Sequence, residues 1–133
     1  MIDQNILIID DHQGFRETLR ELIQRNFPQV HIEEAQSGEE GVIRAVNQKP
    51  DVSLIDICLP GIDGLETAKQ IKTLLPHMHI ITMSMFQERS FEELITKKNI
   101  IFMNKANMDG ELVALLKKML NGNKKDMSDT VVT

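Results

Sequence analysis

Short apolar runs and longer amphipathic stretches alternate along the 133 residues of the chain. The short runs are rich in Ile, Leu, Val and Met without strict alternation of apolar and polar positions, which is typical of strands covered on both faces of a parallel sheet. Only the second run alternates weakly, which favours a place nearer the edge of the sheet. The predicted strands are residues 5–9, 30–35, 51–56, 79–84 and 100–104.

The longer stretches repeat their apolar positions at spacings of three and four, as one face of a helix does. Ser37 and Asp63 each open such a stretch and stand three residues before a Glu, the spacing of an N-cap and its partner. The second helix has its apolar positions at Val42, Ile43, Ala45 and Val46. The predicted helices run from Phe15 to Phe27, from Ser37 to Pro50, from Asp63 to Pro76, over residues 88–98, and from a cap at Asn107 or Asp109 to Leu120.

Strands that alternate with helices through short connections predict a doubly wound α/β fold, with a five-stranded parallel sheet and helices on both of its faces. A hydrophobic content of 41% over this length suits the core of a single domain. Residues 121–133 show no lasting period. We therefore expect one domain over residues 1–122, followed by a flexible tail or the start of a linker over residues 123–133.

Composition narrows the partners that this chain can have. A formal net charge of -5 and the absence of Trp and Tyr argue against direct contact with nucleic acid, which demands clustered Lys and Arg. The sequence has neither an 18-residue apolar window nor a basic and apolar leader, so we expect no membrane contact. Cys58 is the only cysteine, which fits a reducing compartment. The expected location is the cytoplasm.

Polar side chains follow the carboxyl ends of four predicted strands: Asp10, Asp11, Asp56, Ser84 and Lys105. In open parallel sheets functional groups gather at these ends, so we expect the five side chains to converge. Two unit charges about 4 Å apart repel by ~4 kcal/mol at an effective dielectric near 20, so the carboxylates need a countercharge. Lys105 and a divalent cation can supply it. Oxygen ligands without a His or Cys set favour Mg²⁺ over zinc.

Four motifs in this order resemble the receiver domain of two-component response regulators, from residue 1 to about residue 122. They are I-L-I-I-D-D-H, L-I-D-I-C-L-P-G-I-D-G, the pair Ser84-Met85, and F-M-N-K. The opening I-D-D-H-Q-G-F-R-E-T-L resembles the NarL/LuxR-like subclass, in which a receiver precedes a helix-turn-helix domain that these 133 residues do not include. The resemblance implies the flavodoxin-like strand order 2-1-3-4-5.

The resemblance also implies roles for the polar cluster. Asp56 would be the phosphoacceptor that attacks a phosphohistidine on a sensor histidine kinase or a phosphotransfer protein. Asp11 and Asp56 would bind Mg²⁺ directly, Asp10 would bind it through water, and the backbone carbonyl of Cys58 would be a further ligand.

A second set of roles concerns the response to phosphorylation. Ser84 would hydrogen-bond a phosphoryl oxygen, Lys105 would form a salt bridge to it, and Phe102 would change rotamer. The surface near the fourth and fifth helices would then control an output domain, a partner or a homodimer. The chain would be a signalling switch rather than an enzyme, limited to its own phosphorylation and slow self-dephosphorylation.

Two departures from the family pattern leave an alternative open. Met85 stands where Ala is usual, and Ala106 stands where many receivers have Pro. The alternative is a degenerate receiver-like interaction module that phosphate does not control. A small Mg²⁺-dependent phosphatase is a weaker hypothesis, because Asp56-Ile57-Cys58 lacks the second Asp that haloacid dehalogenase-like phosphatases use.

Overall fold

The computed structural model describes residues 4–85 and 100–125, and its core element is a parallel sheet. Its strand order is β2-β1-β3-β4-β5, which confirms the predicted fold class and order. The weakly alternating second strand lies at the edge, as its pattern predicts. The strands are β1 (Asn5–Ile9), β2 (His31–Ala35), β3 (Val52–Asp56), β4 (His79–Ser84) and β5 (Ile100–Asn104).

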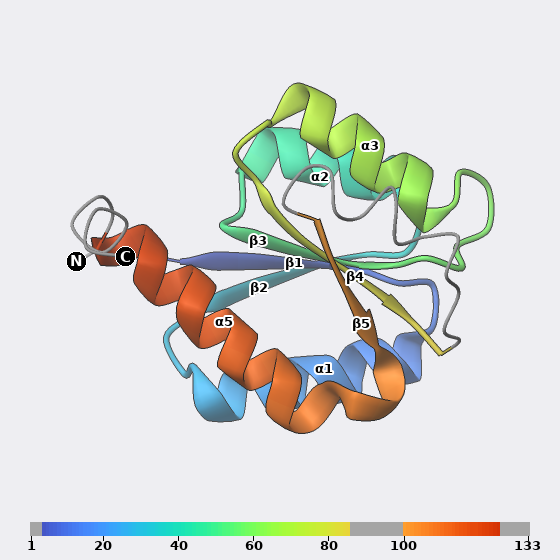
Figure 1. Ribbon diagram of the computed structural model, residues 1–133. Coiled ribbons are helices and arrows are strands. Elements are labelled where there is room, and N and C mark those ends of the chain that lie inside the picture. Colours follow the sequence, from blue (N-terminus) through green and yellow to red (C-terminus); the bar gives the residue numbers. More distant parts are fainter. Residues whose placement is uncertain (1–3, 86–99, 126–133) are drawn as a thin grey trace.

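Helices cover both faces of the sheet (Figure 1). The helices α1 (Gln13–Asn26) and α5 (Met108–Lys125) lie on one face, and α2 (Gly38–Gln48) and α3 (Gly64–Leu74) lie on the other. Along β1, Ile6 and Ile8 belong to one hydrophobic cluster, while Leu7 and Ile9 belong to the other. This two-sided burial explains why the strand is a continuous apolar run. The helix predicted over residues 88–98 lies outside the described residues.

Two helices begin at the caps that the sequence predicts. The Ser37 hydroxyl accepts a hydrogen bond from the Glu40 backbone N–H at 3.1 Å. The Asp63 carboxylate accepts one from the Glu66 backbone N–H at 2.9 Å. Each side chain satisfies a backbone donor that has no partner within its helix. Asp63 therefore has a capping role, although it lies near Asp56 in the sequence.

The start of α5 differs from the prediction. The Asn104 side chain accepts a hydrogen bond from the Ala106 backbone N–H at 2.8 Å and caps a short 3-10 turn. This turn runs directly into α5 at Met108. A cap at Asp109 is therefore wrong, because Asp109 already lies inside α5, whereas a capping role for Asn107, which directly precedes the helix, stays a prediction.

The end of α5 also differs from the pattern. The helix extends to Lys125, beyond Leu120, the last position of its apolar face. A helix that has already formed grows with one hydrogen bond per added residue and needs no further apolar contact. Residues 126–133 of the expected tail lie outside the described residues. Within the part of the chain that the structure describes, no helix is long and apolar enough to cross a membrane.

The inward face of α2 is formed by small residues rather than by its large apolar ones. Ile43 is 61% exposed and Val46 is 38% exposed, so these two apolar side chains lie outside the core. A Cβ on Gly41 would lie 2.4 Å from the Ile9 Cδ1 atom. The helix thus lies too close to the sheet for large side chains between them. The buried residues of α2 are Gly38, Gly41 and Ala45.

Candidate functional site

The strand order brings the predicted polar residues to one edge of the sheet. Asp10 directly follows β1, and Asp56 is the last residue of the neighbouring strand β3. Ser84 ends β4, and Lys105 directly follows β5. All strands are parallel, so these residues lie at carboxyl ends that share one side of the fold.

Three carboxylates form a cluster at this edge. Asp10, Asp11 and Asp56 each offer one oxygen, and these three oxygens lie within 4.8 Å of one another. Asp10 is fully buried and Asp56 is 6% exposed, whereas Asp11 is exposed. A group of carboxylate oxygens that leaves one side of the ion open to solvent suits Mg²⁺, because this ion usually keeps several water ligands. The residues present therefore fit the expected ion.

Lys105 supplies the countercharge within the described residues. Its Nζ atom lies 3.0 Å from Asp10 Oδ2 and 3.5 Å from Asp56 Oδ2. The same atom lies 4.0 Å from the centroid of the Phe15 ring, a cation–π contact. The Lys105 side chain is only 9% exposed, so little solvent screens these interactions. One ammonium group thus bridges the ends of β1 and β3.

The Asp56 carboxylate lies in an environment that opposes its ionisation. Burial raises the pKa of Asp56 above its ordinary value, and the charge of Asp10 raises it further. Lys105 and the Cys58 backbone N–H, which donates to Asp56 Oδ1 at 3.1 Å, partly offset this rise. A further cation at the cluster would lower the same pKa.

A tight turn after Asp56 brings the start of α3 back against the end of β3. Gly61 has a φ of 73°, a left-handed conformation that favours glycine. The Gly64 backbone N–H donates to the Ile57 carbonyl at 2.8 Å. A Cβ on Gly64 would lie 2.0 Å from the Asp56 backbone oxygen. The start of α3 is therefore packed directly against the backbone of the predicted phosphoacceptor.

The remaining predicted site residues are Ser84, Phe102 and Cys58. Ser84 is buried, one residue beyond Met83, which is the register partner of Asp56. Phe102 is half-buried in β5, on the face covered by α2 and α3. Cys58 is exposed, and its backbone N–H rather than its thiol contacts Asp56. Their proposed roles stay predictions.

Arg16 is not among the site residues predicted from the sequence, although it bonds to Asp10 in the structure. Its Nη1 atom donates to the Asp10 backbone carbonyl at 2.7 Å, and its Nε atom donates to Glu34 at 2.7 Å. Arg16 precedes Leu19 by three residues and Ile23 by seven, within the apolar stripe of α1. An arginine at such a stripe position is the signal that could have identified it.

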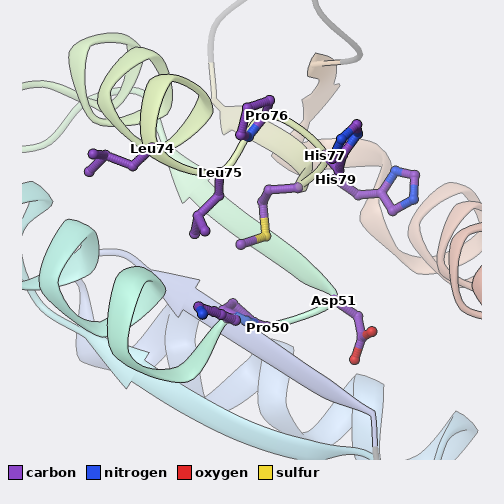
Figure 2. A pocket seen from close by; sticks show the side chains of 9 residues that line it. Pro50, Asp51, Leu74, Leu75, Pro76, His77 and His79 are labelled. Atoms are coloured by element: carbon purple, nitrogen blue, oxygen red, sulfur yellow. The ribbon is translucent and has the colours of Figure 1, made fainter.

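Two hollows differ in their relation to the cluster. One of about 340 Å³ lies between α1 and the start of α5, and Phe15 and Lys105 line it. The other, of about 400 Å³, lies at the opposite end of the strands, beside Pro50, Asp51 and Leu75 (Figure 2). Of these two hollows, only the first is lined by Lys105, which contacts Asp10 and Asp56.

Comparisons with known proteins agree with this geometry. The family model described as the response regulator receiver domain matches residues 6–117. The transcriptional regulatory protein LiaR of Bacillus subtilis is 40% identical over 81 residues, which are 61% of this chain and 38% of LiaR. The sporulation initiation phosphotransferase F of the same organism is 31% identical over 88 residues, which are 66% of this chain and 69% of that protein.

A solved structure shows the same fold. The crystal structure of a LuxR-family two-component response regulator from Aurantimonas sp. SI85-9A1 superposes with a TM-score of 0.81 at 24% identity. The likeness covers 99% of this chain and 100% of that one. Because the family model matches most of the sequence, this chain belongs to the response regulator receiver domains of two-component systems.

Proposed function

We propose that this chain is a phosphorylation-dependent signalling switch in which Asp56 accepts a phosphoryl group from a sensor histidine kinase or a phosphotransfer protein. The observation that carries the proposal is the position of the Asp56 carboxylate, at a strand end between two further acids and the Lys105 ammonium. The likeness to a sporulation initiation phosphotransferase supports it.

The reaction needs a nucleophile in line with the bond that breaks. An Asp56 carboxylate oxygen attacks the phosphorus atom of a phosphohistidine and forms an acyl phosphate. The phosphorus–nitrogen bond breaks, and its electron pair stays on the imidazole nitrogen, which takes up a proton. Asp56 must be ionised to attack, so Lys105 favours the reactive form by partly offsetting the rise in its pKa.

Asp10, Asp11 and Asp56 would hold Mg²⁺, together with the backbone carbonyl of Cys58. When bound, the ion supplies positive charge against the oxygens of the transferring phosphoryl group. Lys105 lies close enough to Asp56 to form an ion pair with the product. Ser84, at the end of the next strand, would donate a hydrogen bond to a phosphoryl oxygen.

Phosphorylation would change the surface through local electrostatics. An acyl phosphate at Asp56 adds negative charge and acceptor oxygens at one point, which draws Ser84 inward and changes the packing of Phe102. To move an equilibrium between the unphosphorylated and the phosphorylated conformation from 1:99 to 99:1, phosphorylation must favour the second conformation by ~5.5 kcal/mol. A few charge-assisted hydrogen bonds supply this free energy. The output is a helix-turn-helix domain on the same polypeptide, a homodimer or a separate partner.

Incubation with acetyl phosphate and Mg²⁺ tests the proposal. Mass spectrometry should find one added phosphate on the wild-type chain and none on Asp56→Asn. Asp109→Asn, which removes an exposed carboxylate outside the cluster, is the matched control and should be phosphorylated normally. An unchanged mass for the wild type, or equal labelling of Asp56→Asn, contradicts the proposal and favours an interaction module without phosphate control.

A further inference from the structure

Arg16 is a charged side chain that is almost completely buried. Its side chain is 9% exposed, although it belongs to the surface helix α1. A buried guanidinium is costly unless its donors have partners. Its Nε atom bonds to Glu34, which also receives a bond from Arg20 at 2.7 Å. Its Nη1 atom bonds to the Asp10 backbone carbonyl at 2.7 Å.

Four hydrogen bonds hold Asp10. Its backbone N–H donates to the Ala35 carbonyl at 3.1 Å, and its backbone carbonyl accepts from Arg16. Its carboxylate accepts from the His12 backbone N–H at 2.8 Å and from Lys105 at 3.0 Å. Arg16 is therefore the side chain that fixes the peptide link between Asp10 and the next residue.

That peptide link determines where the exposed acid of the cluster lies. Asp11 follows Asp10 directly and is exposed, whereas the Asp10 carboxylate is buried. A shift of the Asp10 carbonyl moves the Asp11 backbone with it, and the distance from Asp11 to Asp56 then changes. Groups that orient the ligands of a metal commonly change its affinity without touching it.

We propose that Arg16 is a positioning residue that holds the Asp10-Asp11 backbone in the geometry required for binding a divalent cation. This inference rests on the proposed function and adds to it a residue outside the ligand set. Arg16 acts through its bond to the Asp10 carbonyl, and its ion pair with Glu34 keeps the guanidinium in place for that bond.

Lysine cannot replace arginine in this role. The guanidinium presents several donors in a fixed plane and reaches the Asp10 carbonyl and Glu34 together. An ammonium is a compact charge on a flexible stem, so Arg16→Lys keeps the charge but loses the paired geometry. Arg20 offers a matched comparison, because it bonds to Glu34 and to the Ile32 carbonyl but not to Asp10.

Calorimetric titration of the 133-residue chain with Mg²⁺ tests the proposal. We expect Arg16→Lys to weaken Mg²⁺ binding about tenfold and Arg20→Lys to change it less than about twofold. Phosphorylation by acetyl phosphate gives a second readout. Arg16→Lys should need about ten times more Mg²⁺ for its half-maximal rate and should reach the wild-type rate at saturating Mg²⁺. Circular dichroism confirms that each variant is folded at the temperature used.

Equal affinities for the two lysine variants overturn the proposal, whether both are weakened or both are unchanged. A reduced rate of Arg16→Lys at saturating Mg²⁺ also contradicts it, because a positioning role in cation binding is then insufficient. A wild-type chain that binds no Mg²⁺ contradicts the proposed function itself, so the two failures are distinguishable.

Glu34→Gln keeps the test decisive if Arg16→Lys is unfolded. This variant removes the negative charge at position 34, but the amide oxygen of glutamine can still accept a hydrogen bond from Arg16 Nε and so keep the guanidinium on the Asp10 carbonyl. We expect it to lower the melting temperature and to keep Mg²⁺ affinity within about twofold of the wild type. A tenfold loss of affinity would mean that cation binding follows overall stability, which overturns the proposal.

Discussion

The Lys105 Nζ atom lies 4.0 Å from the centroid of the Phe15 ring while its other neighbours are carboxylates. The ring face carries partial negative charge and adds a third attraction for the same ammonium. A side chain with one aromatic and two acidic neighbours has little freedom to move. The contact therefore links α1 to the position of the countercharge.

We expect Phe15 and Lys105 to be energetically coupled. A double-mutant cycle with Phe15→Leu and Lys105→Met should give a coupling free energy of about 0.5–1 kcal/mol in thermal or urea unfolding. Phe27→Leu is a suitable control, because Phe27 packs on the same hydrophobic cluster. Its cycle with Lys105→Met should be additive. If the free energies of unfolding are also additive in the cycle of Phe15→Leu with Lys105→Met, the Phe15 ring contributes packing and no attraction for the ammonium group.

Asp56→Asn should stabilise the chain at neutral pH without Mg²⁺. The pKa of Asp56 is raised in the folded state, so the native protein holds its proton more tightly than the unfolded chain does. Stability therefore falls as the pH rises from the ordinary value of 3.8 through the raised value, and Asn removes this loss. The melting temperature should rise by about 4 °C for each kcal/mol recovered.

The comparison needs a pH series and a second variant. The difference in melting temperature between the wild type and Asp56→Asn should disappear below pH 3.8, where the Asp56 carboxyl is protonated in both the folded and the unfolded state. Added Mg²⁺ should also narrow it, because the ion stabilises only the wild type. Asp109→Asn should not raise the melting temperature. If the difference in melting temperature stays the same in acid, the stabilisation by Asp56→Asn comes from packing and not from the loss of charge.

Gly64→Ala should destabilise the fold by about 2–3 kcal/mol, because the added methyl would overlap backbone atoms of Asp56 and Ile57. Backbone atoms cannot move aside as a flexible side chain can. Gly110→Ala is the contrasting change, since no atom beyond the adjoining turns of α5 lies within 4 Å of its Cβ position. It should stabilise by about 0.5–1 kcal/mol. Denaturant unfolding measures both, and a mild effect at Gly64 would disprove the close packing.

Glu34→Gln should make the chain less stable at neutral pH by about 2 kcal/mol, since it weakens charge-assisted bonds to Arg16 and Arg20. Burial raises the pKa of Glu34, but the two guanidinium groups outweigh it and hold the pKa below its ordinary value of 4.5. The stabilisation is therefore complete above pH 4.5 and is lost as the pH falls through the lowered value. The melting temperatures of the wild type and Glu34→Gln should therefore converge as the pH falls. A difference that is the same at every pH would contradict this prediction.

The sequence predicted the sheet and the acidic cluster because both follow from short-range patterns. Buried strands are apolar runs, and the rule for carboxyl ends then brings Asp10, Asp56 and Lys105 together without knowledge of any contact. Ser37 and Asp63 were identifiable as caps for a similar reason, since a cap and its partner are only three residues apart.

The missed features depend on contacts between distant segments. The position of Arg16 in the apolar stripe of α1 indicates burial, but no local pattern identifies its partner Glu34, which lies 18 residues away on β2. Gly41 carries no hydrophobic signal, yet its lack of a side chain determines which face of α2 meets Ile9. In both cases the tertiary partner cannot be read from the residue itself.

The ion pair between Lys105 and Asp10 joins residues that are 95 positions apart. During synthesis the acids of the cluster leave the ribosome before the lysine that neutralises them. The N-terminal strands can pair early, but their carboxylates repel one another until β5 has been made and docked. A nascent chain therefore carries an incomplete acidic cluster until completion of β5 brings Lys105 next to Asp56 as a countercharge.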